Sequence, residues 1–399
     1  MDVVQQIQTY NFGRDPERLA LKYSAMRNST FAFLRGTCHL FYAQLPRGGG
    51  LKSAPAVWAC GDLHLENFGS YKGDNRLVYF DLNDFDDAVL APASWDLLRL
   101  LTSLHVAGPG LGMDARDTAL LSEHFLDSYA TTLAGGKAYR VERETAQGLV
   151  HELLDSLRHR QRTSFLDTRT VIKRRRRLLK VDGKKALPVS DAQRRALTRF
   201  MGEFAKGQTN SDFYEMLDVA RRVAGTGSLG VERFVILVNG KGGTDGNYLL
   251  DLKMAQPSSL LPALKIAQPV WASEAHRVVA LQRRMQAVSM AFLQPVHFNE
   301  TPCVLRALQP AEDRVSLSGA HRSAGELAEL IGTMGQLIGW AHLRSSGREG
   351  SAIADELIAF GHRRKWRARL LDLSQDCAAQ LQRDAATFNS AFDDGVFNV

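Results

Sequence analysis

One short stretch constrains the fold and the chemistry of this chain more than any other. It comprises residues 60–68 (Cys-Gly-Asp-Leu-His-Leu-Glu-Asn-Phe) and the acidic run at 80–87 (Phe-Asp-Leu-Asn-Asp-Phe-Asp-Asp). Residues 73–75 (Gly-Asp-Asn) lie between two strand-like segments and predict a hairpin turn. A second strand that ends at Asp81 would bring its carboxylate back beside Asn67. The stretch therefore predicts a strand, a loop and a hairpin that gather polar side chains at one place.

The polar residues of this stretch are of the types that phosphoryl transfer requires. Asp62 and Asn67 are five residues apart, which is the spacing of the Asp and Asn in the protein-kinase catalytic loop. In that chemistry an Asp orients or deprotonates the accepting hydroxyl, while an Asn and an Asp hold Mg²⁺ against the phosphates of ATP. We therefore expect Asp62 to act as the base, with His64 beside it as a candidate catalytic residue whose main role is to organise the loop. The expected metal ligands are Asn67 and either Asp81 or Asp84.

The loop also resembles that of a known group of enzymes. The pattern Gly-Asp-x-His-x-x-Asn-Phe at residues 61–68 resembles the catalytic loop of aminoglycoside and choline kinase-like phosphotransferases. Residues 95–98 (Trp-Asp-Leu-Leu) resemble the helix start that follows the metal-binding loop of those enzymes. The resemblance implies that Asp96 stabilises the loop from that helix and takes no part in the chemistry.

A wider similarity, which spans nearly the whole chain, is to a bacterial family that is known only as domain-of-unknown-function family 2252. The segments that carry this similarity are residues 26–36, the loop at 61–64, residues 81–86 and residues 95–100. The family implies no substrate. The expectation of a small-molecule acceptor therefore comes from the resemblance to aminoglycoside and choline kinases alone.

A glycine-rich turn follows in the second half of the chain. Gly225, Gly227 and Gly230 form a Gly-x-Gly-x-x-Gly pattern between two expected strands, whereas a dinucleotide-binding loop would open a helix. Glycines at such positions let the backbone lie close over phosphates. We therefore expect these three glycines, together with Ser228, to bind a nucleotide.

We expect strands at 233–238 and 248–255 and a helix from about 273 to 292. Lys253 lies in the second of these strands, where it could meet the α- and β-phosphates of that nucleotide. In a kinase this Lys pairs with a Glu of the following helix. Glu274 is the natural partner here, although Gln282 or Gln286 could take the polar role. The order of glycine loop, strand with Lys, helix and two strands is that of the small ATP-binding lobe of a protein-kinase-like fold.

These parts follow one another in an order that differs from that of a kinase. Residues 327–343 have a long apolar face and resemble the helix that leads into the catalytic loop, yet that loop lies far upstream in this chain. We therefore predict an α+β, protein-kinase-like two-lobe fold with a circularly permuted lobe order, since a new connection only has to run over the surface. The expected divisions are the catalytic-loop part of the large helical lobe at 1–215, a small ATP-binding lobe at 216–312, and C-terminal helices at 313–399 that complete the large lobe.

Much of the net charge of +7 comes from a basic run at residues 173–185. We expect a basic hairpin at 171–189 with Asp182-Gly183 as its turn. Such a run is most often a solvated face, and the alternative is a patch that binds anions or nucleic acid. Aromatic residues are not interleaved through the run, which argues against stacking on single-stranded nucleic acid.

Composition adds expectations about where the protein works. A hydrophobic content of 45% and a charged content of 23% are those of an ordinary globular protein, and no apolar run is long enough to cross a bilayer. The first residues lack the basic and hydrophobic regions of a signal peptide, and the four cysteines are scattered without metal-binding spacing. We therefore expect a reduced, cytoplasmic protein without a membrane partner.

Together these patterns predict an ATP- and Mg²⁺-dependent phosphotransferase that acts on a hydroxyl of a small molecule. Three alternatives remain open at this point. They are a kinase-like enzyme that transfers AMP to protein, a non-catalytic nucleotide-binding protein, and a protein that binds nucleic acid through the basic run.

Overall fold

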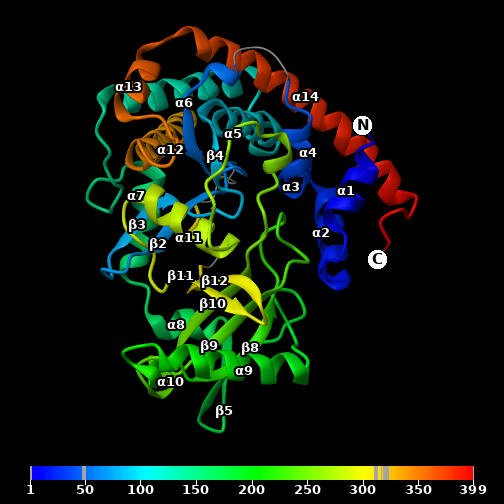
Figure 1. The fold of residues 1–399 in the computed structure, drawn as a ribbon, viewed down its shortest axis with the longest axis vertical. Coiled ribbons are helices and arrows are strands. Elements are labelled where there is room, and N and C mark those ends of the chain that lie inside the picture. Colours follow the sequence, from blue (N-terminus) through cyan, green and yellow to red (C-terminus); the bar gives the residue numbers. More distant parts are fainter. Residues whose placement is uncertain (1, 47–50, 310–312, 316, 318–322, 399) are drawn as a thin grey trace.

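A computed structural model describes residues 2–46, 51–309, 313–315, 317 and 323–398. The predicted mixed α+β class is confirmed, with 51% helix and 16% strand. A large helical part lies above a smaller part that is built on a six-stranded sheet (Figure 1). In the described ranges, none of the helices combines the length and the apolar character that a bilayer crossing requires.

The helices gather mainly in the large part. Their bounds are α1 (Val3–Asn11), α2 (Pro16–Asn28), α3 (Thr30–Gly36), α4 (Cys38–Ala43), α5 (Ala93–Ala107), α6 (Ala115–Gly135), α7 (Gly148–Arg158), α8 (Arg162–Asp167), α9 (Asp191–Lys206), α10 (Gly243–Gly246), α11 (Glu274–Met285), α12 (Ala324–Ser345), α13 (Ala354–His362) and α14 (Lys365–Asp393). The strands are β1 (Ala56–Ala59), β2 (Phe68–Lys72), β3 (Val78–Leu82), β4 (Val89–Pro92), β5 (Thr170–Lys173), β6 (Arg176–Leu179), β7 (Ala186–Leu187), β8 (Met216–Arg222), β9 (Arg233–Val238), β10 (Tyr248–Met254), β11 (Gln294–Phe298) and β12 (Thr301–Ala307).

The large sheet has the strand order β11-β12-β10-β9-β8-β7, and every neighbouring pair is antiparallel. The strands expected around 233–238 and 248–255 are confirmed as β9 and β10. The glycine-rich turn at 223–230 connects β8 to β9, and α11 lies between β10 and β11 in the chain. The helix expected to run to residue 292 ends at Met285, because the next residue has extended backbone angles.

The two faces of this sheet are covered by different elements. Helix α9 packs Leu197 and Met201 against Phe234 and Leu250 on one face of the sheet. This helix is visible below the strands in Figure 1. Helix α8 and strand β6 cover part of the opposite face. The hydrophobic core around the sheet therefore includes residues upstream of 216, where we expected the small lobe to begin.

The large part is organised around α5. All residues from Ala93 to Leu104 of this helix are buried, as expected for a helix surrounded by others. Two short antiparallel pairs belong to this part: β1 with β4, which contacts α5, and β2 with β3. They flank the loop at 60–67 and confirm the predicted hairpin with its turn at 73–75.

The end of α12 meets the start of β1, although the two segments are far apart in the chain. The Ala352 amide donates a hydrogen bond to the Ala56 carbonyl (2.7 Å), and Trp58 Nε1 donates to the Arg348 carbonyl (3.2 Å). Strand β1 leads directly into the loop at 60–67. A chain that ran from α12 straight into β1 would therefore need only a short connection.

The basic hairpin is present, but its predicted turn is wrong. Strands β5 and β6 pair through Lys173 and Arg176, so the turn residues are Arg174 and Arg175. Both have positive φ angles, 48° and 64°, as a two-residue hairpin turn requires. The Asp-Gly signal at 182–183 instead forms a separate turn, in which the Asp182 carboxylate accepts hydrogen bonds from three following backbone amides.

Candidate active site

The loop at 60–67 is held in place by the first turn of α5. Asp96 is fully buried there, and its carboxylate accepts hydrogen bonds from the backbone amides of Cys60 (2.7 Å) and Gly61 (2.9 Å). Tyr42 donates from its hydroxyl to the Gly61 carbonyl. Buried backbone groups require such partners, because no water can replace them. The expected stabilising role of Asp96 is therefore confirmed by its contacts.

Replacing Asp96 with Asn is expected to lower the free energy of unfolding by about 2–3 kcal/mol, because one of the two buried amides loses a charged acceptor. Chemical denaturation followed by circular dichroism measures this change. Asp372→Asn, at an exposed position on α14, is the matched control and should have little effect. Equal stability of Asp96→Asn and wild type would contradict the role of this carboxylate.

Arg99, on the same helix, fixes the candidate base. Its buried guanidinium donates from Nε to Asp62 Oδ1 (2.8 Å), and from Nη2 to the same oxygen and to the Leu34 carbonyl. Because both bonds to Asp62 end on Oδ1, its second oxygen Oδ2 remains on the side of Gly227. Burial raises the pKa of Asp62, and the charge of Arg99 offsets only part of that rise. A carboxylate with a raised pKa is better suited to accept a proton.

His64 and Asn67 shape the loop through its backbone. Asn67 Oδ1 accepts from the His64 amide (2.9 Å), and His64 Nδ1 accepts from the Glu66 amide (3.1 Å). Burial lowers the pKa of His64 well below its usual range, which keeps the ring neutral. These contacts agree with the expectation that His64 mainly organises the loop.

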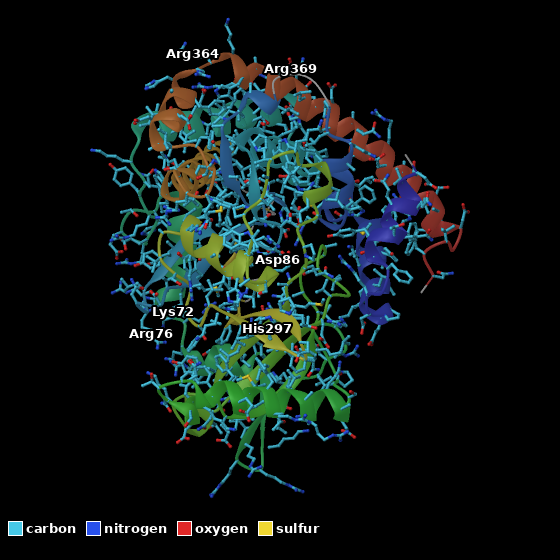
Figure 2. The ribbon with its side chains drawn as sticks, in the orientation of Figure 1. Lys72, Arg76, Asp86, His297, Arg364 and Arg369 are labelled. Atoms are coloured by element: carbon cyan, nitrogen blue, oxygen red, sulfur yellow. The ribbon has the colours of Figure 1, made fainter. Side chains whose placement is uncertain are left out.

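The acidic run after β3 brings carboxylates to Lys253. The Lys253 ammonium forms an ion pair with Asp86, which lies between the helical part and the sheet (Figure 2). Although burial opposes ionisation, Lys253 lowers the pKa of Asp86. Burial and the charge of Asp86 raise the pKa of Asp84. Asp87 follows and accepts a hydrogen bond from the Ser259 amide (2.7 Å).

The glycine-rich turn lies directly over the candidate base. A Cβ atom added at Gly227 would stand 2.9 Å from the Arg35 carbonyl oxygen and 3.6 Å from Asp62 Oδ2, so a larger residue would push the turn away. Arg14 donates to the Gly227 carbonyl (2.9 Å), and the buried Lys22 donates to the same carbonyl (3.3 Å). Segments from three separate regions of the chain therefore meet at this turn.

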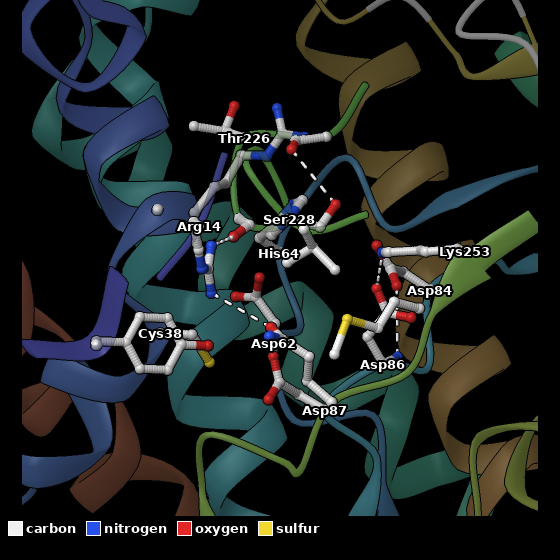
Figure 3. A pocket seen from close by; sticks show the side chains of 18 of the residues that line it. Arg14, Cys38, Asp62, His64, Asp84, Asp86, Asp87, Thr226, Ser228 and Lys253 are labelled. Carbon is white, nitrogen blue, oxygen red and sulfur yellow. Dashed lines mark hydrogen bonds and ion pairs between the residues drawn. The ribbon is translucent and has the colours of Figure 1, made fainter. Parts of the chain in front are cut away.

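These segments line one cavity, called here the acidic cavity. Lys253 points toward Asp84 and Asp86 on one side of it, and Asp62 lies beside Asp87 on the other (Figure 3). The predicted site residues that line this cavity are Asp62, His64, Asp84, Gly225, Gly227, Ser228 and Lys253.

Four predicted site residues are not among those that line the acidic cavity. Gly230 packs against Arg14 at the end of the turn, and Asn67 bonds within its own loop. Glu274 forms an ion pair with Arg277 on its own helix, so the predicted pairing with Lys253 is replaced by that with Asp86. The fourth residue, Asp81, is treated next.

Asp81 lies outside the acidic cavity because its carboxylate is held by other partners. Strand β3 does not end at Asp81 but continues to Leu82, which pairs with Phe68, so Asp81 pairs with Gly69. The Asp81 carboxylate forms an ion pair with Arg344 of α12 (3.2 Å) and accepts a hydrogen bond from the Ala287 amide (3.1 Å).

Two acidic residues of the cavity, Asp86 and Asp87, were not predicted as site residues. The signal for Asp86 is present in the sequence, since it replaces the Gly of a kinase Asp-Phe-Gly triplet with a third carboxylate. Asp87 lies with Cys38 and Asp62 in a group whose potential ligand atoms are all within 4.8 Å of one another. That proximity depends on the tertiary fold and leaves no local pattern.

The donor set of the acidic cavity fits Mg²⁺. Four carboxylates line it, those of Asp62, Asp84, Asp86 and Asp87. Mg²⁺ binds through one or two carboxylates together with water and phosphate oxygens, and such oxygens are the donors found here. The mutual repulsion that raises the pKa of Asp84 would be relieved by a divalent cation between the carboxylates.

Comparisons with known proteins identify a family but no activity. Neither the curated proteins nor the solved structures include one that matches this chain. Residues 14–391 match the model of a bacterial family that is described as "Uncharacterized protein conserved in bacteria (DUF2252)". That match covers nearly the whole chain, including the loop at 60–67, the acidic run and the glycine-rich turn. The chain therefore belongs to the DUF2252 family.

Proposed function

We propose that this protein is an ATP- and Mg²⁺-dependent phosphotransferase that acts on a hydroxyl of a small molecule. One observation carries the proposal: the segment with Asp62 and Asp84 and the segment with the glycine turn and Lys253 line the same cavity, although they lie more than a hundred residues apart. Each motif alone is weak. Their convergence supplies a base, acidic metal ligands, a phosphate-binding turn and a cation in one place, as phosphoryl transfer requires.

The topology around the glycine turn supports a kinase-like small lobe. Strands β8, β9 and β10, helix α11 and strands β11 and β12 follow one another as in that lobe, and the sheet order places β12 beside β10. The contact between the end of α12 and the start of β1 supports the permuted order, because those ends would be joined in an unpermuted chain. We therefore keep the permuted two-lobe fold as part of the proposal.

In this mechanism each residue acts from its observed position. Asp62 Oδ2 receives the proton of the accepting hydroxyl, while Arg99 holds Oδ1 and prevents rotation of the carboxylate. Lys253 and the amides of the glycine turn would neutralise phosphate charge, and Asp84 would hold Mg²⁺, while Asp86 stays paired with Lys253. Bound Mg²⁺ would supply charge neutralisation at the transferred phosphoryl group. Catalysis then comes from positioning and from preorganised charge.

The two candidate metal ligands predict opposite results when they are replaced. Asp84→Asn should raise the Mg²⁺ concentration needed for half-maximal ATP binding by about tenfold or more, because it removes a cavity carboxylate. Asp81→Asn should leave that concentration unchanged and lower stability, because it breaks the buried pair with Arg344. Titrating Mg²⁺ at fixed ATP measures both variants. If Asp81→Asn raises the required Mg²⁺ concentration and Asp84→Asn does not, the metal ligand is Asp81.

The function itself is tested by incubating the protein with Mg-ATP and a panel of small hydroxyl compounds that includes aminoglycosides and choline. Chromatography of the nucleotide products should show ADP formed faster with one class of acceptor than with water. Protein acceptors and nucleic acid, added separately, represent the other functions that the sequence left open. Nucleotide consumption that no small hydroxyl compound accelerates, but that a protein does, would contradict the proposed substrate class.

A further inference from the structure

A second cavity adjoins the acidic one and has the opposite charge. It is called here the cationic cavity. The basic residues that line it are Arg169, Lys180, Lys185, Arg222, Arg233, Lys253, Arg306 and Arg314, against the acidic residues Asp84 and Asp182. The two cavities share Asp84, Gly225, Ser228 and Lys253, so they meet at the glycine turn.

The floor of the cationic cavity is a cluster of arginines on one face of the large sheet. Asp251 of β10 is completely buried and contacts the guanidinium groups of Arg222 (2.9 Å), Arg233 (2.6 Å) and Arg306 (3.5 Å). Asp251 lies directly opposite Arg306 in the strand pairing, while Leu250 and Leu252 point to the α9 face. The alternation along β10 therefore turns its charged residues to the cavity and its apolar residues to the core.

This cluster carries more positive charge than Asp251 neutralises. Three guanidinium groups surround that one carboxylate, and arginine does not give up its proton in proteins. Although burial opposes ionisation, Arg222 and Arg233 hold the pKa of Asp251 well below its usual range, so the carboxylate is charged. Arg222 Nη1 lies 2.9 Å from Asp251 Oδ2, but in the described part of the chain it makes no aligned hydrogen bond. Asp84 and Asp86 also act on the cluster from the acidic side, and the positive charge that remains favours a bound anion.

The same cluster gives the floor of the cationic cavity a strongly positive character. Apolar side chains also line the cavity, among them Val235, the strand partner of Asp251, but the hydrogen-bond donors of the floor are the three guanidinium groups. Arginine presents a planar fork of donors that matches phosphate oxygens. A chain of linked phosphates would therefore complement this floor, and Lys253 at the junction would hold its inner end.

We propose that the cationic cavity binds a pyrophosphate group. Two sources share this chemistry: the terminal phosphates of the nucleotide, and a diphosphate on the acceptor. In the first case the α-phosphorus would lie nearest Asp62. The acceptor oxygen would bond to that phosphorus, the bond to the bridging oxygen would break, pyrophosphate would leave with the electron pair, and Asp62 would take the acceptor proton. The binding site itself does not depend on the proposed phosphoryl transfer.

The first experiment is a calorimetric titration with inorganic pyrophosphate. Wild type should bind it, and Arg222→Gln and Arg306→Gln should each weaken binding about tenfold or more, because a charge-assisted phosphate contact is lost. Arg222→Lys keeps the charge without the fork and should weaken binding less. Arg174→Gln, at the exposed hairpin tip, is the charge-matched control and should bind as wild type does. Thermal unfolding of each variant verifies that it is folded.

Two outcomes would overturn the proposal: no pyrophosphate binding by wild type, or equal weakening by Arg174→Gln and Arg222→Gln. A competition titration then separates the two sources. Displacement of Mg-ATP by pyrophosphate assigns the cavity to the nucleotide and predicts release of pyrophosphate during turnover, with transfer of AMP in place of the phosphoryl transfer that yields ADP. Simultaneous binding of both assigns it to a diphosphorylated acceptor. If the wild type binds pyrophosphate but not ATP, the proposed function is refuted and this inference stands. If it binds ATP but not pyrophosphate, and Arg222→Gln leaves ATP binding unchanged, this inference is refuted and the proposed function stands.

Discussion

Asp62→Asn is expected to reduce group transfer by about 10²–10⁴-fold while Mg-ATP binding stays within a few-fold of wild type. The amide can still accept the hydrogen bonds that Arg99 donates to Oδ1, so the loop should keep its position. It cannot receive the proton of the accepting hydroxyl at Oδ2. The loss should therefore fall on turnover and not on nucleotide affinity, and rapid-quench measurement of ADP and AMP formation separates the two.

The matched control for this variant is Asp74→Asn, in the exposed hairpin turn between β2 and β3. It makes the same chemical change outside the cavity and should turn over nucleotide as wild type does. Turnover of Asp62→Asn at the wild-type rate would remove Asp62 from the mechanism. Loss of Mg-ATP binding together with turnover would instead mean that Asp62 holds the nucleotide or its metal.

Lys253→Met is expected to weaken Mg-ATP binding by about 10²-fold. The substitution removes the cation that lines both cavities and leaves the Asp86 carboxylate without its ion-pair partner. Loss of a charge-assisted contact to phosphate, together with an uncompensated carboxylate beside that phosphate, accounts for an effect of this size. Titration with a fluorescent ATP analogue measures the change.

The matched control for Lys253→Met is Lys241→Met, in the exposed turn between β9 and β10. The double variant Lys253→Met/Asp86→Asn tests whether the uncompensated Asp86 carboxylate causes part of the loss in affinity. Because the second change removes the uncompensated carboxylate, it should recover part of the affinity lost by Lys253→Met. Equal binding by Lys253→Met and wild type would exclude this residue from the nucleotide site.

Local patterns in the sequence predicted the elements of this fold well. The apolar runs around 233–238 and 248–255 gave β9 and β10 with bounds close to those observed, because buried strands require such runs. The helix at 327–343 was also recovered as the central part of α12. Each of these elements is specified by its own residues, so no knowledge of its neighbours was needed.

Features that depend on partners were harder to predict. Asp81 was placed near Asn67 by counting, but its carboxylate binds Arg344 and the Ala287 amide, which lie far away in the sequence. Lys253 was paired with Glu274 by analogy with kinases, whereas in the structure it forms an ion pair with Asp86. In both cases the segment that carries the residue was predicted, but the partner of its side chain in the fold was not.

The arginine cluster on the large sheet was likewise not predicted, because its residues become neighbours only in the fold. Arg222, Arg233, Asp251 and Arg306 lie on four different strands and are spread over residues 222–306. Only the sheet order brings their side chains to one face. The basic hairpin was predicted because its charges are contiguous in the sequence. The buried positive charge beside the candidate site comes instead from these dispersed residues.

The measurement that tests the central claim most directly is calorimetric titration of the wild-type protein with ATP, in the presence and absence of Mg²⁺. A single cleft built from the loop at 60–67, the acidic run and Lys253 predicts binding of one nucleotide per chain, with Mg²⁺ strengthening it through the carboxylates. The same titration on Asp84→Asn should lose most of the dependence on Mg²⁺. Absence of nucleotide binding under both conditions would contradict the account.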